Sequence, residues 1–271
     1  MTWSRIDPRY LVLLFLISFV LAGQLLLGFF QQWDSLFVSV GTSVTAELVL
    51  VRLLRGRWTP PLSALITGLG ISLLLSSYLL WPYVLASLLA IIIKHAVRLR
   101  GKHVFNPNNV AMCMMLYFLP QYAVSTPKQW TNGYEVMAFI LLLGAIAAYS
   151  AGRLDTVLAF ILGFAWFALI RCYVFDEPLL YAFGPMLGAS FQLFSFFMIT
   201  DPQTTPPTRM ARVVFAFCIA GLDAWLRIQE ITNSTFYSAF LVALLIGLPY
   251  RVYKGRNRIR PVSIAEREES Q

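Results

Sequence analysis

Long stretches of the chain carry no charged residue and alternate with short segments that contain arginine, lysine or proline. The longest uncharged stretches are residues 10–33, 58–93, 104–127, 136–152, 156–170, 178–200 and 231–250. A helix needs about 20 apolar residues to cross the hydrocarbon core of a bilayer. The stretch 58–93 is therefore long enough for two helices, with a turn at Trp81-Pro82.

This pattern predicts an all-α membrane protein with about ten transmembrane segments. The expected segments are 10–30, 35–51, 62–79, 82–97, 107–120, 134–151, 156–174, 180–200, 210–228 and 233–250. The fifth of them is short for a full crossing. No cleavage site of the Ala-x-Ala type follows the first segment, so we expect it to stay in the protein.

The positions of the basic residues predict which loops face the cytoplasm. If the N-terminus is inside, ten alternating crossings leave only Lys128, Arg171 and Arg227 of the 21 Lys and Arg on the outer side. Loops on the cytoplasmic side carry the excess of Lys and Arg in membrane proteins. We therefore expect a multi-pass protein of a bacterial-type cytoplasmic (inner) membrane, with both termini in the cytoplasm.

Composition excludes other protein classes. Hydrophobic residues make up 58% of the chain and charged residues 13%, too few to cover the surface of a soluble enzyme. The net charge of +8 is spread between apolar stretches, so we expect anionic lipid headgroups as partners and no nucleic acid. The widely spaced Cys113, Cys172 and Cys218 predict small buried side chains and no metal site.

Ten segments divide into a first membrane half (1–120), an interhalf loop (121–133) and a second membrane half (134–250). A basic and then acidic cytoplasmic tail (251–271) follows, and we expect it to lie on lipid headgroups without a fold of its own. Because each half has an odd number of crossings, the second half enters from the opposite side. Two halves of one fold would then form an inverted repeat.

The third segment of each half is rich in Gly, Pro, Ser and Thr, around residues 60–70 and 196–207. Such residues at corresponding positions of two halves indicate interrupted helices that form a binding site. The alternative is that small residues allow close helix packing and that Thr208 caps the next helix. Both interpretations remain open.

A polar cluster extends from His103 to Asn109. Asn106 followed by Pro107 predicts the N-cap and first residue of a helix. With Arg100 and Lys102 nearby, this helix N-terminus is suited to a phosphate or another anion. Ordinary capping beside positive-inside charge explains the same residues.

Three stretches carry a family resemblance: Ser63-Ala64-Leu65-Ile66-Thr67-Gly68, Phe105-Asn106-Pro107, and Phe196-Phe197-Met198-Ile199-Thr200-Asp201-Pro202-Gln203-Thr204 followed by Pro207. In order and spacing the chain resembles the RnfD/NqrB-like family, the membrane subunits of Rnf-type complexes and of the sodium-pumping NADH:quinone oxidoreductase. The longer versions at 103–109 and 183–215 look closest to the UnbU-like branch associated with enediyne biosynthesis.

The resemblance implies ten helices in two inverted halves, similar to urea and ammonium channels. It also implies flavin binding and electron transfer inside a complex of several membrane subunits. One motif is missing, the Ser/Thr-Gly-Ala-Thr sequence whose last Thr carries FMN, because Gly188-Ala189-Ser190 lacks that Thr. We therefore expect noncovalent FMN or riboflavin, or no flavin.

Two acidic residues fall inside expected membrane segments, where burying a charge is costly. Glu47 and Asp223 are therefore candidates for an ion pathway. The alternatives are structural: Glu47 reaches water or pairs with a nearby Arg, and Asp223 pairs with Arg227 four residues later on the same helix face.

No nucleophile–base set, metal cluster or nucleotide-binding motif occurs, and His95 and His103 lie on separate segments. We expect no catalytic residue of its own, so the protein is at most a redox subunit of a membrane oxidoreductase. The leading hypothesis is a flavin-binding electron-transfer subunit, and the alternatives are a small-solute transporter or channel and an accessory structural subunit. The expected cofactor-binding residues are Thr67, Asn106, Asn108, Thr200, Asp201, Thr204 and Thr205.

Overall fold

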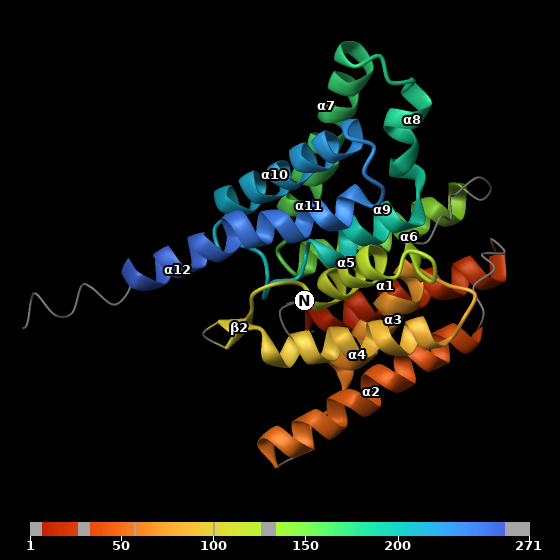
Figure 1. The fold of residues 1–271 in the computed structure, drawn as a ribbon, viewed down its shortest axis with the longest axis vertical. Coiled ribbons are helices and arrows are strands. Elements are labelled where there is room, and N and C mark those ends of the chain that lie inside the picture. The colour runs from red at the N-terminus through yellow and green to blue at the C-terminus, as the bar shows by residue number, and fades with distance from the viewer. Residues whose placement is uncertain (1–6, 27–32, 57, 100, 126–133, 258–271) are drawn as a thin grey trace, which may run out of the picture.

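The computed structural model describes residues 7–26, 33–56, 58–99, 101–125 and 134–257 of the 271. Within these ranges most residues belong to helices (Figure 1). Arg100, the end of the first expected segment (27–30), most of the interhalf loop (126–133) and the tail beyond 257 lie outside the described residues.

The first half and the start of the interhalf loop contain five main helices and two short strand pairs. The helices are α1 (Pro8–Leu21), which continues into the π-helical η2 (Ala22–Leu26), α2 (Trp33–Arg55), α3 (Leu62–Leu74), α4 (Trp81–Ala96) and α5 (Pro107–Phe118). Strand β1 (Leu75–Ser76) pairs antiparallel with β4 (Val124–Ser125), and β2 (Arg98–Leu99) pairs antiparallel with β3 (Lys102–His103).

The second half begins with α6 (Tyr134–Ser150) and α7 (Leu154–Val174). An interrupted segment follows, made of α8 (Leu179–Phe183), the 3₁₀ turn η3 (Gly184–Leu187), α9 (Ala189–Leu193) and the π-helical η4 (Phe194–Met198). The last elements are α10 (Arg209–Ile228), α11 (Ser234–Val242), the π-helical η5 (Ala243–Gly247) and α12 (Leu248–Asn257).

Helices of the two halves pack in a corresponding order. Helix α2 packs against α4 and α4 against α5, while α7 packs against α10 and α10 against α11. The halves meet where α1 contacts α6 and where α5 contacts α11. The buried core is rich in aromatic side chains, among them Phe15, Phe19, Phe160, Phe164 and Phe194.

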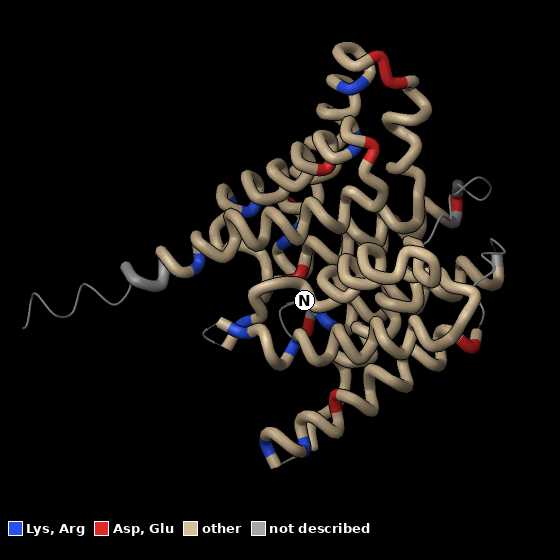
Figure 2. Tube along the Cα trace, in the orientation of Figure 1, with Lys and Arg blue, Asp and Glu red and all other residues tan. Residues whose placement is uncertain are grey.

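Three helical stretches of the described chain are long and apolar enough to cross a membrane: Trp33–Arg55, Leu154–Val174 and Ser234–Tyr253. Large apolar side chains such as Leu53, Leu162 and Leu245 are exposed on their surfaces. Most Lys, Arg, Asp and Glu lie near helix ends and loops (Figure 2). The prediction of a mainly helical protein with membrane-length helices is confirmed at this level, and ten crossings remain a prediction.

Several predicted boundaries are wrong. The helix expected over 62–79 ends at Leu74, because residue 75 pairs with β4 and the Tyr83 hydroxyl donates to the Leu75 carbonyl (3.3 Å). The stretch 180–200 is broken at Gly184-Pro185 and at Gly188, earlier in the chain than the interruption expected around 196–207. The tail expected to begin at Arg251 without a fold is helical as far as Asn257, since α12 continues there.

Candidate functional site

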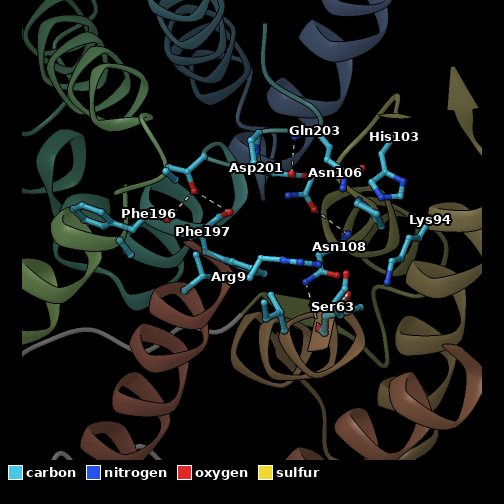
Figure 3. Close-up of a pocket in the computed structure, with 18 residues that line it drawn as sticks. Arg9, Ser63, Lys94, His103, Asn106, Asn108, Phe196, Phe197, Asp201 and Gln203 are labelled. Atoms are coloured by element: carbon cyan, nitrogen blue, oxygen red, sulfur yellow. Dashed lines mark hydrogen bonds between the residues drawn. The ribbon is translucent and has the colours of Figure 1, made fainter. Parts of the chain in front are cut away.

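A cavity of about 170 Å³ lies between α3, the start of α5, and η4 with the turn that follows it (Figure 3). Helix α3 is continuous from Leu62 to Leu74, so the interruption expected around 60–70 is not found within it. Ser63, Ile66 and Thr67 of α3 contribute to its wall, and Phe196 and Phe197 of η4 contribute on another side. The predicted site residues that line it are Thr67, Asn106, Asn108, Thr200 and Asp201. The fold thus brings together residues from both halves that are far apart in the sequence.

Asn106 connects the start of α5 with the end of η4. Its Oδ1 accepts hydrogen bonds from the backbone N–H groups of Asn108 (3.0 Å) and Asn109 (3.3 Å), and Pro107 follows it at the first turn. Its Nδ2 donates to the Met198 carbonyl (2.8 Å). The predicted N-cap is confirmed, and the same side chain fixes two walls of the cavity.

Asn108 connects α5 with α3. Its Nδ2 donates to the Thr67 carbonyl (3.3 Å), and the Thr67 hydroxyl donates to the Ser63 carbonyl (2.9 Å). Gly70, one turn further along α3, makes room for this contact, because a Cβ there would lie 2.5 Å from Asn108 Nδ2 and 2.5 Å from Phe197 Cε1. Phe197 therefore lies directly against the α3 backbone.

The Thr-Asp-Pro stretch forms a compact turn after η4. The Thr200 hydroxyl donates to the Phe196 carbonyl (2.8 Å), and the Asp201 carboxylate accepts from the backbone N–H of Gln203 (2.9 Å). The Asp201 carbonyl accepts from the Thr204 (3.3 Å) and Thr205 (3.0 Å) hydroxyls. Burial raises the pKa of the Asp201 carboxyl, and the bond from Gln203 N–H opposes that rise.

Thr204 and Thr205 do not line the main cavity, contrary to the expectation that all seven residues share one site. They line a second cavity of about 30 Å³, together with Asn106 and Asn109. The reason is the turn itself, because their hydroxyls close it by bonding to the Asp201 carbonyl.

Three cationic or titratable side chains of the main cavity are absent from the sequence-based set: Arg9, Lys94 and His103 (Figure 3). Burial, together with the positive charges of Arg98 and Lys94, lowers the pKa of His103 to about 4. Its Nδ1 is buried and has no hydrogen-bond partner among the residues that the structure describes. The signal that could have found His103 is its position at the start of the polar cluster 103–109.

Arg251 of α12 connects two segments beside the cavity, one at His103 and the other at Gln203. Its guanidinium donates to the carbonyl of His103 and to the carbonyl of Gln203 (2.9 Å to the latter). These contacts join β3 to the loop that follows η4.

Glu47 lies next to the cavity without lining it. Its carboxylate accepts from Lys94 Nζ (2.9 Å), and its second oxygen lies 2.8 Å from His95 Nε2. The sequence left open whether Glu47 would reach water or pair with a nearby Arg, and the structure pairs it with Lys94 and His95 instead. The pairing is long-range, because Lys94 and His95 come from the end of α4, which packs beside α2.

Asp223 lies apart from the cavity and is fully buried. Arg227 Nε donates to its carboxylate (2.8 Å), as the spacing of four residues predicts. The Ser234 (2.7 Å) and Thr235 (2.8 Å) hydroxyls donate to the same group. The predicted ion pair is confirmed, with two further donors from α11.

No group of three or more metal-binding side chains occurs in the part of the chain that the structure describes. No family model matches the chain. No curated protein matches its sequence.

Proposed function

We propose that the protein is an integral membrane subunit of the RnfD/NqrB-like type, which holds a noncovalent flavin in the main cavity and takes part in electron transfer. In this proposal ten helices form two inverted halves in a bacterial-type cytoplasmic membrane. Both termini face the cytoplasm, and other membrane subunits are partners. The corresponding packing of α2, α4 and α5 and of α7, α10 and α11 supports the inverted halves.

The observation that carries the proposal is the lining of the cavity. Apolar side chains such as Ile66, Phe196 and Phe197 form part of the wall, while Asn106 and Asn108 add polar groups fixed by hydrogen bonds. Cofactor sites combine apolar walls with a few fixed polar groups in this way. Redox chemistry would come from the flavin, and the protein would orient it and exclude water.

The cavity is small for a whole flavin, since pockets for ligands of that size usually enclose about 300–1,000 Å³. At about 170 Å³ it is large enough for one edge of the ring system, and the rest of the flavin would lie outside it. Phe197 packed on Gly70 narrows the space beside α3. This close contact favours a binding site over a pore for solute passage.

The test is a spectrum of the detergent-purified protein, isolated gently from its native membrane with its partners, before and after acid denaturation. We expect flavin to be released in near-stoichiometric amount. Thr67→Val removes a cavity hydroxyl while keeping the side-chain shape, and we expect it to retain less flavin. Thr232→Val, at an exposed position outside the cavity, is the matched control. A colourless wild-type preparation would overturn the proposal.

A further inference from the structure

We infer that an open cleft where the C-terminal ends of α7 and α10 meet binds the headgroup of phosphatidylethanolamine, with the phosphate at Arg227 and the primary ammonium group at Glu230. The cleft shares no lining residue with the main cavity. The inference depends on the membrane setting of the proposed function and is independent of the flavin. In the proposed orientation this end of both helices faces the outer side of the membrane.

The cleft has a volume of about 610 Å³ and lies between α7, α8, η3 and the loop that follows α10. This size is within the range of about 300–1,000 Å³ that is usual for small-ligand sites. The charged residues that line it are Arg171, Glu177, Arg227 and Glu230. The apolar side chains of Leu180, Tyr181 and Ile231 also line it and are exposed. Charged groups beside exposed apolar side chains complement an amphipathic ligand such as a lipid.

Arg227 presents a fixed and accessible donor to the cleft. Its Nε donates to Asp223 (2.8 Å) and its Nη2 to Thr235 (3.1 Å). Its Nη1 makes no hydrogen bond to another described residue, and 24% of the side chain is exposed. The other cation, Arg171, is 2% exposed and pairs with Glu177 (2.9 Å). Arg227 is therefore the cation that a phosphate can reach, and guanidinium groups bind phosphate oxygens strongly.

Glu230 occupies a position that does not suit a glutamate. Its φ of +57° lies in the left-handed region, which favours glycine and, after it, asparagine. It closes the end of α10, where its N–H donates to the Arg227 carbonyl (2.9 Å) and the Ile231 N–H donates to the Leu226 carbonyl (3.0 Å). The helix dipole disfavours a negative charge at this end. An acid that breaks two local rules at once is typical of a functional position.

The charges of the cleft select the headgroup. Glu177 is already paired with Arg171, whereas Glu230 is exposed and has no side-chain partner among the described residues. One donor at Arg227 and one carboxylate at Glu230 therefore remain, and they complement a phosphate joined by a short linker to a primary ammonium group. A glycerol headgroup brings no positive charge to Glu230, and the quaternary nitrogen of choline has no N–H to donate.

The test is a lipid competition on the delipidated full-length protein in detergent, measured by native mass spectrometry. The probes are phosphatidylethanolamine, phosphatidylcholine, phosphatidylglycerol and diacylglycerol with identical acyl chains. The proteins are the wild type, Glu230→Asn, which suits the left-handed conformation and removes the charge, and Asp176→Asn as the matched control. Asp176 has the same conformation (φ +54°) after α7 and does not line the cleft. Thermal unfolding of each protein confirms that it is folded.

We expect the wild type to bind phosphatidylethanolamine about fivefold more tightly than the other two phospholipids, the upper range for an exposed ion pair. Diacylglycerol should bind more weakly than all three, because it lacks the phosphate for Arg227. Glu230→Asn should lose the preference and unfold at the wild-type temperature or above, since backbone strain and repulsion by the helix dipole are relieved. Asp176→Asn should keep the preference.

Equal affinity of the wild type for the three phospholipids would overturn the inference, and so would a Glu230→Asn protein that keeps the preference. Diacylglycerol bound as tightly as phosphatidylethanolamine would overturn the role of Arg227. Loss of the preference in Asp176→Asn would assign it to the overall charge of this end and not to Glu230. If Glu230→Asn does not fold, the four lipids on the wild type decide the question. No outcome involves flavin, so failure here is distinct from failure of the proposed function, which flavin release tests.

Discussion

Gly70 determines how closely α3, α5 and η4 approach each other around the cavity. In Gly70→Ala the new Cβ would lie 2.5 Å from both Asn108 Nδ2 and Phe197 Cε1, where ordinary contacts begin at 3.4 Å. Each side chain must therefore move by roughly 1 Å. Both line the cavity, so the substitution disturbs the binding site directly.

The expected cost follows from three contributions. Overpacking of a core costs about 1–3 kcal/mol. Weakening the bond from Asn108 to the Thr67 carbonyl, already 3.3 Å long, costs about 1 kcal/mol more. Alanine recovers up to about 1 kcal/mol of helix propensity relative to glycine. We expect a net destabilisation of about 1–3 kcal/mol and a loss of ligand affinity.

The assay compares thermal unfolding and riboflavin affinity for three alanine variants. At Gly41 a Cβ meets nothing within 4 Å, so Gly41→Ala should unfold at the wild-type temperature or slightly above. At Gly68 a Cβ would lie 2.6 Å from the α2 backbone at Val40, which cannot rotate away. Gly68→Ala should be the least stable. A Gly70→Ala protein that matches Gly41→Ala in both measurements would refute the reasoning.

The remaining predictions concern buried charges. The pKa of His103 in the folded protein is about 4, below the ordinary value near 6.5, so the unfolded chain takes up the proton first on acidification. The free energy of unfolding should therefore fall by roughly 3 kcal/mol between pH 6.5 and pH 4. Unfolding measured as a function of pH should lose this contribution in His103→Asn. Asp223→Ala leaves Arg227 without its carboxylate and should lower the free energy of unfolding by about 3–5 kcal/mol. The double variant Asp223→Ala/Arg227→Met should recover part of that loss, and thermal unfolding measures both effects. Glu47→Gln should likewise destabilise the protein by several kcal/mol, because the buried Lys94 loses its charged partner. If the variant changes ion flux in liposomes and leaves stability unchanged, the structural role assigned to Glu47 is wrong.

Features set by neighbouring residues could be predicted from the sequence. The Asn106 cap depends on the next three residues, and the pair of Asp223 and Arg227 depends on helical spacing. The pair of Glu47 and Lys94 could not be predicted, because it depends on how α2 packs beside α4. His103 lies at the start of the polar cluster 103–109, but that cluster alone does not show that its side chain lines the same cavity as α3 and η4.

Sequence composition also could not separate the roles within one motif. Thr200 and Asp201 line the main cavity, whereas Thr204 and Thr205, three to five residues later, face a smaller one. The turn that separates them is closed by hydroxyl bonds to the Asp201 carbonyl. Such bonds depend on backbone geometry, which a row of threonines and prolines does not specify.

The contacts of Arg251 have a consequence for biosynthesis. The two loops that it joins, at His103 and Gln203, leave the ribosome well before α12 does. Until α12 is synthesised and inserted, those loops lack the guanidinium that holds them beside each other. Maturation of the cavity is therefore a late step of assembly, and a nascent chain stalled before residue 251 should carry every lining residue without the finished site.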